Sequence, residues 1–428
     1  MCQKNVDIHI CINFIKGDCM KMPQKRSLAV FATALLLPLS VFADDRVTTI
    51  ANEMTRQVEQ YNFAIHILAM LLVGFGFLMV FVKRYGYSAT TGTYLVVAAG
   101  IPLYAFLRST GLISAEPVNV ASIKALLLAE FACASALIAM GAILGRIKLF
   151  QYGLLALVVV PAYMINEWLV LDGGLGITKG FVDSAGSIII HAFGAYCGLG
   201  LAIALTSFKQ SAQPVQSDET SDRFSMLGSM VLWIFWPSFC SAVVSHEQMP
   251  LTVVNTIFSL CGATLTTYIA SNLFRKGKVL LADMINAALA GGVAIGATCN
   301  ILSPASAFGV GALAGFICMV GFVFIQPALQ RKFNKVDTCG VHNLHGMPGI
   351  IGGLVAILAV PNVLISQLSG IVFTVAFALA TGYLGGYIIR LTGTPKTAYD
   401  DSEAFGGVEE FIDNEIETVP ENIAVFNR

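Results

Sequence analysis

Apolar runs long enough to cross a lipid bilayer follow one another along most of this chain. A helix needs about 20 apolar residues to span a hydrocarbon core about 30 Å thick. In lipid every backbone polar group must pair within the structure, so such runs fold as helices rather than as open sheets. We place eleven of them near 62–82, 93–113, 121–143, 149–171, 184–207, 224–244, 251–273, 279–299, 306–325, 340–360 and 366–390. The sequence predicts an all-α polytopic membrane protein with eleven transmembrane helices.

Composition excludes the main soluble classes. Of 428 residues, 56% are hydrophobic and 12% are charged, whereas ordinary globular chains are about 25% charged. The formal net charge of −1 provides no basic field for nucleic acid. The cysteines include no C-x-x-C pair, and we interpret them as small packing residues.

The first 43 residues have the pattern of a leader. Lys25 and Arg26 precede the apolar run 28–39, and Val41-Phe42-Ala43 resembles a cleavage site. This order is typical of a bacterial secretory signal. We expect residues 1–43 to be removed and the mature chain to begin near Asp44, outside the membrane. An uncleaved first helix is the alternative.

Basic residues occur mainly in the loops after the odd-numbered spans. They are Lys83 and Arg84, Arg146 and Lys148, Lys209 and Arg223, Arg275, Lys276 and Lys278, Arg331, Lys332 and Lys335, and Arg390 and Lys396. Lysine and arginine mark cytoplasmic loops. The pattern therefore predicts a periplasmic N-terminus and a cytoplasmic C-terminus in a bacterial inner membrane, which agrees with the signal sequence.

A polar linker, 208–223, divides the spans into two blocks. Residues 44–207 form a first block of five helices and 224–360 a second. Because five is odd, the second block enters the membrane from the opposite side, which is typical of an inverted repeat with functional groups near the midplane. An eleventh helix at 361–391 and an acidic cytoplasmic tail at 392–428 complete the prediction. We expect the tail to be disordered or loosely docked.

Each block ends in a segment that carries a carboxylate and a histidine. The first is D-S-A-G-S-I-I-I-H, with Asp183 and His191, and the second is D-T-C-G-V-H-N-L-H, with Asp337 and His342. Ionisable groups inside a bilayer are costly and usually serve a pathway. Because the two segments run in opposite directions, we expect His191 and His342 to meet as one titrating unit. A purely structural pair that ties helices together is the alternative.

The carboxylates have two interpretations each. Asp183 and Asp337 precede helices, where they can cap free N–H groups, and Asp183 could also attract cations. Glu167 could draw cations to an outer vestibule or make a structural hydrogen bond. Further candidates are Asn343, His345, Trp168 and Leu171.

Two phenylalanines are candidates for a pore-closing constriction. Phe131 and Phe239 lie in apolar spans, and a ring of this kind excludes hydrated ions while admitting small neutral solutes. Ordinary core packing is the alternative. H-N-L-H, with His342 and His345, lacks a third metal ligand, so we expect neither a metal nor a cofactor.

Several stretches resemble the ammonium transporter superfamily, and specifically its Rhesus (Rh) branch. They are A-E-F-A-C-A-S-A-L-I-A-M-G-A-I-L-G, D-S-A-G-S-I-I-I-H-A-F-G-A-Y-C-G-L, L-W-I-F-W-P-S-F, N-A-A-L-A-G-G-V-A-I-G and D-T-C-G-V-H-N-L-H-G-M-P-G-I-I-G-G. Together with the signal sequence, they resemble the bacterial Rh-type ammonia channels. The resemblance implies a homotrimer of eleven-helix protomers, each with its own pore.

The resemblance also implies roles for residues. By motif position, His191 and His342 match the twin pore histidines, Phe131 and Phe239 the phenylalanine gate, and Asp183 the acidic residue before the first histidine. The chain departs from the bacterial ammonium channels at the outer cation site. Leu171 and Val243 stand near the positions of an aromatic and a hydroxyl residue, with Trp168 one turn away.

We therefore expect a channel, not an enzyme, that conducts ammonia after ammonium loses its proton. A carbon dioxide channel with the same pore is one alternative. An ammonium sensor that acts through its C-terminal tail is another, and a membrane metalloenzyme is a third.

Overall fold

The chain crosses the membrane as a bundle of helices. The computed structural model describes residues 45–113, 117–206 and 213–408, and these contain no strand. The predicted signal peptide lies outside the described residues. Nine helical stretches in the described part are long and apolar enough to span a bilayer: Asn52–Phe81, Gly86–Thr110, Ile123–Ile143, Gln151–Val170, Ser187–Leu205, Glu219–Ser241, His246–Phe274, Pro304–Phe333 and Leu364–Arg390.

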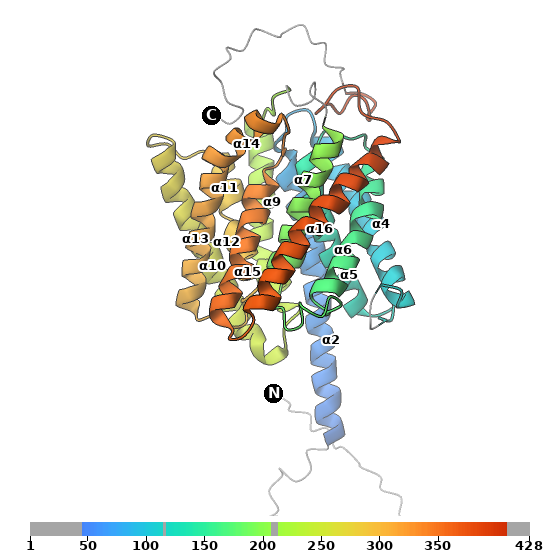
Figure 1. The fold of residues 1–428 in the computed structure, drawn as a ribbon, viewed down its shortest axis with the longest axis vertical. Coiled ribbons are helices and arrows are strands. Elements are labelled where there is room, and N and C mark those ends of the chain that lie inside the picture. The colour runs from blue at the N-terminus through green and yellow to red at the C-terminus, as the bar shows by residue number, and fades with distance from the viewer. Residues whose placement is uncertain (1–44, 114–116, 207–212, 409–428) are drawn as a thin grey trace, which may run out of the picture. The chain divides into compact units, whose positions relative to one another are not determined.

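Several of these spans contain short changes of helix type. The elements of the first half are α2 (Asp45–Ala69), η2 (Met70–Phe75), α3 (Gly76–Leu78), η3 (Met79–Phe81), α4 (Gly86–Thr110), α5 (Ile123–Ile143), α6 (Gln151–Val170), η4 (Ser187–Ala192) and α7 (Phe193–Leu205). Those of the second half are α9 (Glu219–Ser241), η5 (His246–Gln248), α10 (Met249–Phe274), α11 (Leu281–Ala287), α12 (Ala290–Ile295), α13 (Pro304–Val320), η6 (Gly321–Ile325), α14 (Gln326–Phe333), η7 (His342–Gly346), α15 (Met347–Ala359) and α16 (Leu364–Arg390). Figure 1 shows α6, α7 and α16 side by side in the bundle.

The remaining two predicted spans are also helical. The predicted span 279–299 is divided into α11 and α12, whereas η7 and α15 follow each other without a gap in 340–360. With these two, the nine spans above make the eleven crossings that the sequence predicted. Non-helical backbone at membrane depth is tolerated where protein surrounds it, and α12 is fully buried. Broken helices of this kind are typical of membrane proteins that carry small solutes.

Glycines let α15 approach η4 and α12 at backbone distance. A Cβ on Gly349 would lie 2.4 Å from the carbonyl oxygen of Ser187, and one on Gly352 2.4 Å from that of Ala294. The Ser187 hydroxyl donates to the Val293 carbonyl at 2.7 Å. Small residues are how membrane helices pack closely. Three elements, η4, α12 and α15, are thereby held together around Ser187.

Two helices begin earlier than the apolar pattern predicted. α2 starts at Asp45 rather than near 62, because helix continues beyond the apolar run into polar sequence. α9 starts at Glu219, inside the predicted linker 208–223. Asp218 caps it, since its side chain accepts from the N–H groups of Thr220 and Ser221. Such a cap contributes about 1 kcal/mol.

The first part of the C-terminal tail is docked, contrary to the expectation of a loose tail. The Tyr399 hydroxyl accepts from the buried guanidinium of Arg146 and lies 3.2 Å from Thr338 Oγ1. Asp401 is 4% exposed, and its carboxylate accepts from the N–H groups of Tyr87 and Ser88 at 2.9 and 2.8 Å. The acidic composition of the tail did not predict this docking, because composition does not show that the free N–H groups at the start of α4 bind the Asp401 carboxylate.

Candidate functional site

Two short segments with the same construction carry the histidines of the site. In the first, Asp183 Oδ2 accepts from the N–H groups of Ile188 and Ile189 at 2.9 and 2.8 Å. Gly186 has φ of 78°, a left-handed conformation that glycine adopts without strain. The π-helical turn η4 follows and ends one residue after His191. The capping interpretation of Asp183 therefore holds in the structure.

The second segment repeats this arrangement. Asp337 Oδ1 accepts from the Val341 N–H at 2.9 Å, and Oδ2 accepts from the His342 N–H at 3.0 Å. Gly340 has φ of 70°. The π-helical turn η7 follows and contains both His342 and His345. Capping thus describes Asp337 as well.

The structure brings His191 together with His345. Their Nδ1 atoms lie 3.2 Å apart, and the rings are parallel within 4° with centroids 5.3 Å apart. Because the nitrogens are closer than the centroids, the rings meet edge to edge and do not stack face on face. The two side chains are 3% and 4% exposed. A single proton between the nitrogens makes one ring the donor and the other the acceptor.

The predicted pairing of His191 with His342 is wrong. His342 lies about one helical turn before His345, and its ring packs edge-on against Tyr196, with centroids 5.8 Å apart. Its Nδ1 atom is buried without a partner. The first position of η7 directs His342 away from His191, whereas the fourth directs His345 toward it.

A sequence signal for His345 was present. The pattern D-x-x-G-x-x-x-x-H occurs in both segments, as Asp183, Gly186 and His191 and as Asp337, Gly340 and His345. Equal spacing from the capping aspartate and the left-handed glycine places the two histidines at equivalent positions. Choosing the first histidine after Asp337 ignored this register.

Aromatic rings extend from the histidine pair on both sides. Phe131 and Phe239 contact each other with centroids 4.7 Å apart and planes 72° apart, and Phe239 lies 6.0 Å from His191. At the other side, Phe75 stacks on His345 at 6.4 Å. All five rings are buried. They form what we call the ring column: Phe131, Phe239, His191, His345 and Phe75.

Trp236 supports the column from the side. Its indole stacks on His191 with centroids 5.6 Å apart and planes 19° apart. The indole lies against α12, where a Cβ on Gly292 would be 2.3 Å from Trp236 Cε2. Gly292 thus provides the space that sets the position of Trp236 and, through it, of His191.

A narrow cavity adjoins His345. Its volume is ≈ 20 Å³, enough for about one water-sized molecule. Its walls are mostly apolar and include Phe75, Leu137, Gly141, Leu344 and His345. The site can therefore take a small neutral solute without its hydration shell.

His191 has one free polar atom in these surroundings. Its Nε2 is buried and has no partner. With one shared proton between the Nδ1 atoms, one Nε2 of the pair donates and the other accepts. Such a pair can hydrogen-bond a molecule that has both a lone pair and N–H groups.

The other predicted residues are not members of the ring column. Glu167 accepts from the Tyr104 hydroxyl at 2.8 Å and pairs with Arg108 at 3.4 Å, which is the structural alternative rather than an open cation site. Trp168 and Leu171 end α6 with 37% and 39% of their surface exposed. Asn343 donates to Gln326. Among the described residues, no group of three or more His, Cys, Asp or Glu side chains could hold a metal.

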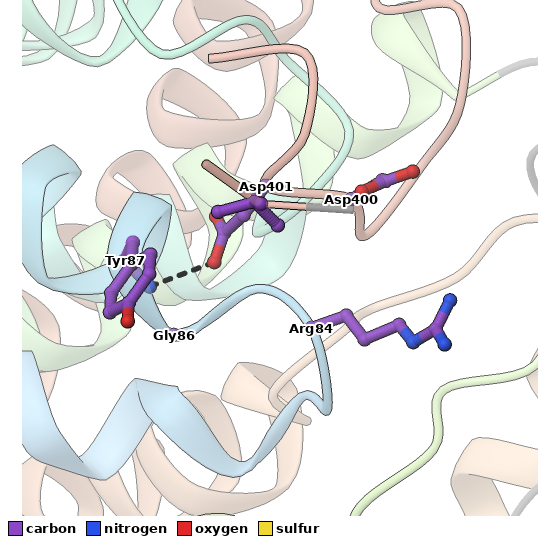
Figure 2. Close-up of a pocket in the computed structure, with 6 residues that line it drawn as sticks. Arg84, Gly86, Tyr87, Asp400 and Asp401 are labelled. Carbon is purple, nitrogen blue, oxygen red and sulfur yellow. Dashed lines mark hydrogen bonds between the residues drawn. The ribbon is translucent and has the colours of Figure 1, made fainter. Parts of the chain in front are cut away.

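A wider hollow lies at the end of the bundle where the tail docks. It measures ≈ 430 Å³ and is lined by Arg84, Gly86, Tyr87, Asp400, Asp401 and Val408. Figure 2 shows Asp401 directed at the backbone of Tyr87, while Arg84 points away from it. The hollow is open to the outside and is separate from the histidine pair.

Comparison with known proteins identifies the family. A profile described as Ammonium Transporter Family matches residues 39–404. The chain belongs to the ammonium transporter family. Its curated relatives place it in the Rh branch. It is 36% identical to the ammonium transporter Rh type A of Canis lupus familiaris over 318 residues, covering 73% of this chain and 75% of the relative.

Other relatives agree with this placement. The Rh type B transporter of Oryctolagus cuniculus is 38% identical over 358 residues, 76% of each chain. The solved structure of Rh50 from Nitrosomonas europaea, assigned to the Rhesus protein family of channels, is 62% identical with a TM-score of 0.83. The alignment covers 83% of this chain and 94% of that one. Saccharomyces cerevisiae Mep2, 16% identical with a TM-score of 0.67, shares the fold.

Proposed function

We propose that this Rh-branch protein is an ammonia channel in which ammonium loses its proton at the ring column and crosses as neutral ammonia. One observation carries the proposal. His191 and His345 face each other at 3.2 Å between the Phe131–Phe239 pair and Phe75. A bare cation is costly in such surroundings, whereas ammonia is neutral and close to water in size.

The histidine pair can both donate a hydrogen bond to ammonia and accept one from it. Ammonia offers one lone pair and three N–H groups, so it can accept from one Nε2 and donate to the other. Ammonium has no lone pair and can only donate. If it gives a proton to an imidazole, the charge stays on the protein and the neutral molecule continues. The proton returns to solvent, so that net ammonia crosses.

The proposal includes an orientation and an assembly. The protein is a homotrimer in a bacterial inner membrane, with a periplasmic N-terminus and a cytoplasmic C-terminus. Three hydrogen-bonded pairs lie at the same end of the bundle: Lys83 with Gln216, Lys335 with Thr206, and Asp401 with Tyr87. The basic loops at that end support its assignment as the cytoplasmic side.

Stopped-flow measurements on proteoliposomes test this function. Vesicles that contain the protein should equilibrate ammonia faster than protein-free vesicles, and the rate should change in His191→Ala and His345→Ala. Carbon dioxide entry is measured on the same vesicles. Acceleration of carbon dioxide alone would establish the alternative gas channel, and acceleration of neither gas would leave the sensor function of the docked tail as the better proposal.

A further inference from the structure

Glu130 is a buried carboxyl group without a partner. It lies on α5, its side chain is 0% exposed, and neither Oε1 nor Oε2 has a hydrogen-bond partner. Buried polar groups in native proteins are nearly always paired. The burial of this unpaired carboxyl group therefore requires an explanation, and the histidine pair does not supply one.

The other buried acids in the described part of the chain all have donors. Glu167 and Asp283 are paired with Arg108 and Arg275. Asp183, Asp337 and Asp401 accept backbone N–H groups. These five contacts account for the burial of the negative charges by hydrogen bonds and ion pairs. Glu130 thus differs from these five buried acids, because its carboxyl group has no donor.

The position of Glu130 on α5 relates it to the ring column. It precedes Phe131, which contacts Phe239. Leu137 and Gly141 follow it by about two and three helical turns, so the three residues share one face of the helix. Leu137 and Gly141 line the ≈ 20 Å³ cavity beside His345. Glu130 is therefore on the pore-facing side of α5, at the level of the phenylalanine pair.

The energetics limit what Glu130 can be. An isolated carboxylate in apolar surroundings costs many kcal/mol, so the group must be neutral or must have a cation beside it. Acidic residues inside membrane bundles commonly mark ion and proton pathways. Glu130 lacks two possible partners, a proton and a monovalent cation. Near a route for ammonium, the substrate can supply either, because ammonium is a monovalent cation that carries a proton.

We propose that Glu130 is a proton-exchange residue for ammonium at the Phe131–Phe239 pair. This inference rests on the proposed function and adds a residue to it. The ionised carboxylate binds ammonium, one N–H bond breaks with its electron pair left on nitrogen, and an O–H bond forms on Glu130. An ion pair of net charge zero becomes two neutral molecules, ammonia and a carboxylic acid. In the reverse direction the acid returns its proton to ammonia.

Transport by two matched variants tests the exchange. Glu130→Gln keeps the size of the side chain but cannot accept a proton, whereas Glu130→Asp keeps the acid. Ammonia flux driven by an ammonium gradient should fall at least about 10-fold in Glu130→Gln and less in Glu130→Asp; general acid–base groups contribute about 10²–10⁴-fold, and the histidines still exchange protons. Thr267→Val is the control, since it also removes a buried polar atom without a partner.

Infrared difference spectroscopy tests the same residue without any transport. Ammonium chloride added to the purified protein, relative to potassium chloride, should change the C=O stretching band of a protonated carboxyl group. The change should be lost in Glu130→Gln and shifted in frequency in Glu130→Asp.

Two results would overturn the inference. One is a wild-type spectrum in which ammonium leaves the carboxyl region unchanged. The other is wild-type flux in Glu130→Gln. If wild-type vesicles show no ammonia acceleration, the proposed function fails, and the spectrum still decides whether Glu130 exchanges a proton with ammonium.

Discussion

His191 and His345 meet through their Nδ1 atoms at 3.2 Å, so only one proton fits between them. Full protonation of both rings would bring two cations into contact in an apolar site, where the cost is far larger than in water. The pair therefore titrates as one unit. A change in either ring removes the hydrogen bond that orients both Nε2 atoms.

We expect His345→Ala to impair ammonia transport far more than His342→Ala. His345 supplies half of the pair, whereas His342 packs on Tyr196. The expected loss for His345→Ala is about 10²-fold, the lower end of general acid–base contributions, and for His342→Ala less than about 2-fold on the same scale. Stopped-flow flux in proteoliposomes measures both.

The double variant of the pair provides the internal control. Because partners in one hydrogen bond are coupled, His191→Ala combined with His345→Ala should lose little more flux than either change alone. Losses that simply multiply, or an equal loss in His342→Ala, would contradict the assignment of His345 as the partner.

The phenylalanine pair should act as a barrier to ions. Phe131→Ala or Phe239→Ala removes the apolar contact between two rings whose centroids lie 4.7 Å apart. We therefore expect both variants to conduct potassium in planar bilayers, where the wild-type protein does not. Removing a buried ring should also cost about 3–5 kcal/mol of stability. Phe308→Ala is the control, because Phe308 is 38% exposed on α13. Ion-tight bilayers with both pair variants would show that the rings only pack.

Gly292 should tolerate no side chain, in contrast to Gly309. A Cβ at Gly292 would lie 2.3 Å from the Trp236 ring, while one at Gly309 meets nothing within 4 Å. We expect Gly292→Ala to cost about 1–3 kcal/mol by overpacking and to slow ammonia flux by moving Trp236 against His191. Gly309→Ala should leave flux unchanged and stability equal or slightly higher. Thermal unfolding in detergent and flux assays compare the two.

Much of the fold followed from the apolar runs. Span length and the need to pair the backbone within lipid predicted the eleven helical crossings. The break between α11 and α12 was not predictable from hydropathy, because residues 281–295 are one apolar stretch. The break lies next to tertiary contacts such as the Ser187 hydroxyl bonded to the Val293 carbonyl.

The candidate site was predicted in part. The contact between Phe131 and Phe239 and the caps by Asp183 and Asp337 agree with the sequence interpretation. The partner of His191 was missed, since both His342 and His345 fit an Asp-then-His pattern, and only the register in a π-helical turn separates them. Glu130 was overlooked because one sequence cannot show whether a buried acid has a donor.

The docked tail should respond to pH through Asp401. Burial raises the pKa of this carboxyl above its ordinary value of 3.8, and its bonds to Ser88 and Tyr87 only partly offset this. The folded state then holds the proton more tightly than the unfolded state, so stability falls as pH rises from 3.8 to the raised pKa and is flat above it. Asp401→Asn removes the titration. The difference in Tm between wild type and Asp401→Asn should therefore change across this window in favour of wild type at the acidic end. A difference that is constant with pH, or that changes in the opposite direction, would show that the docked carboxyl is not held in this way.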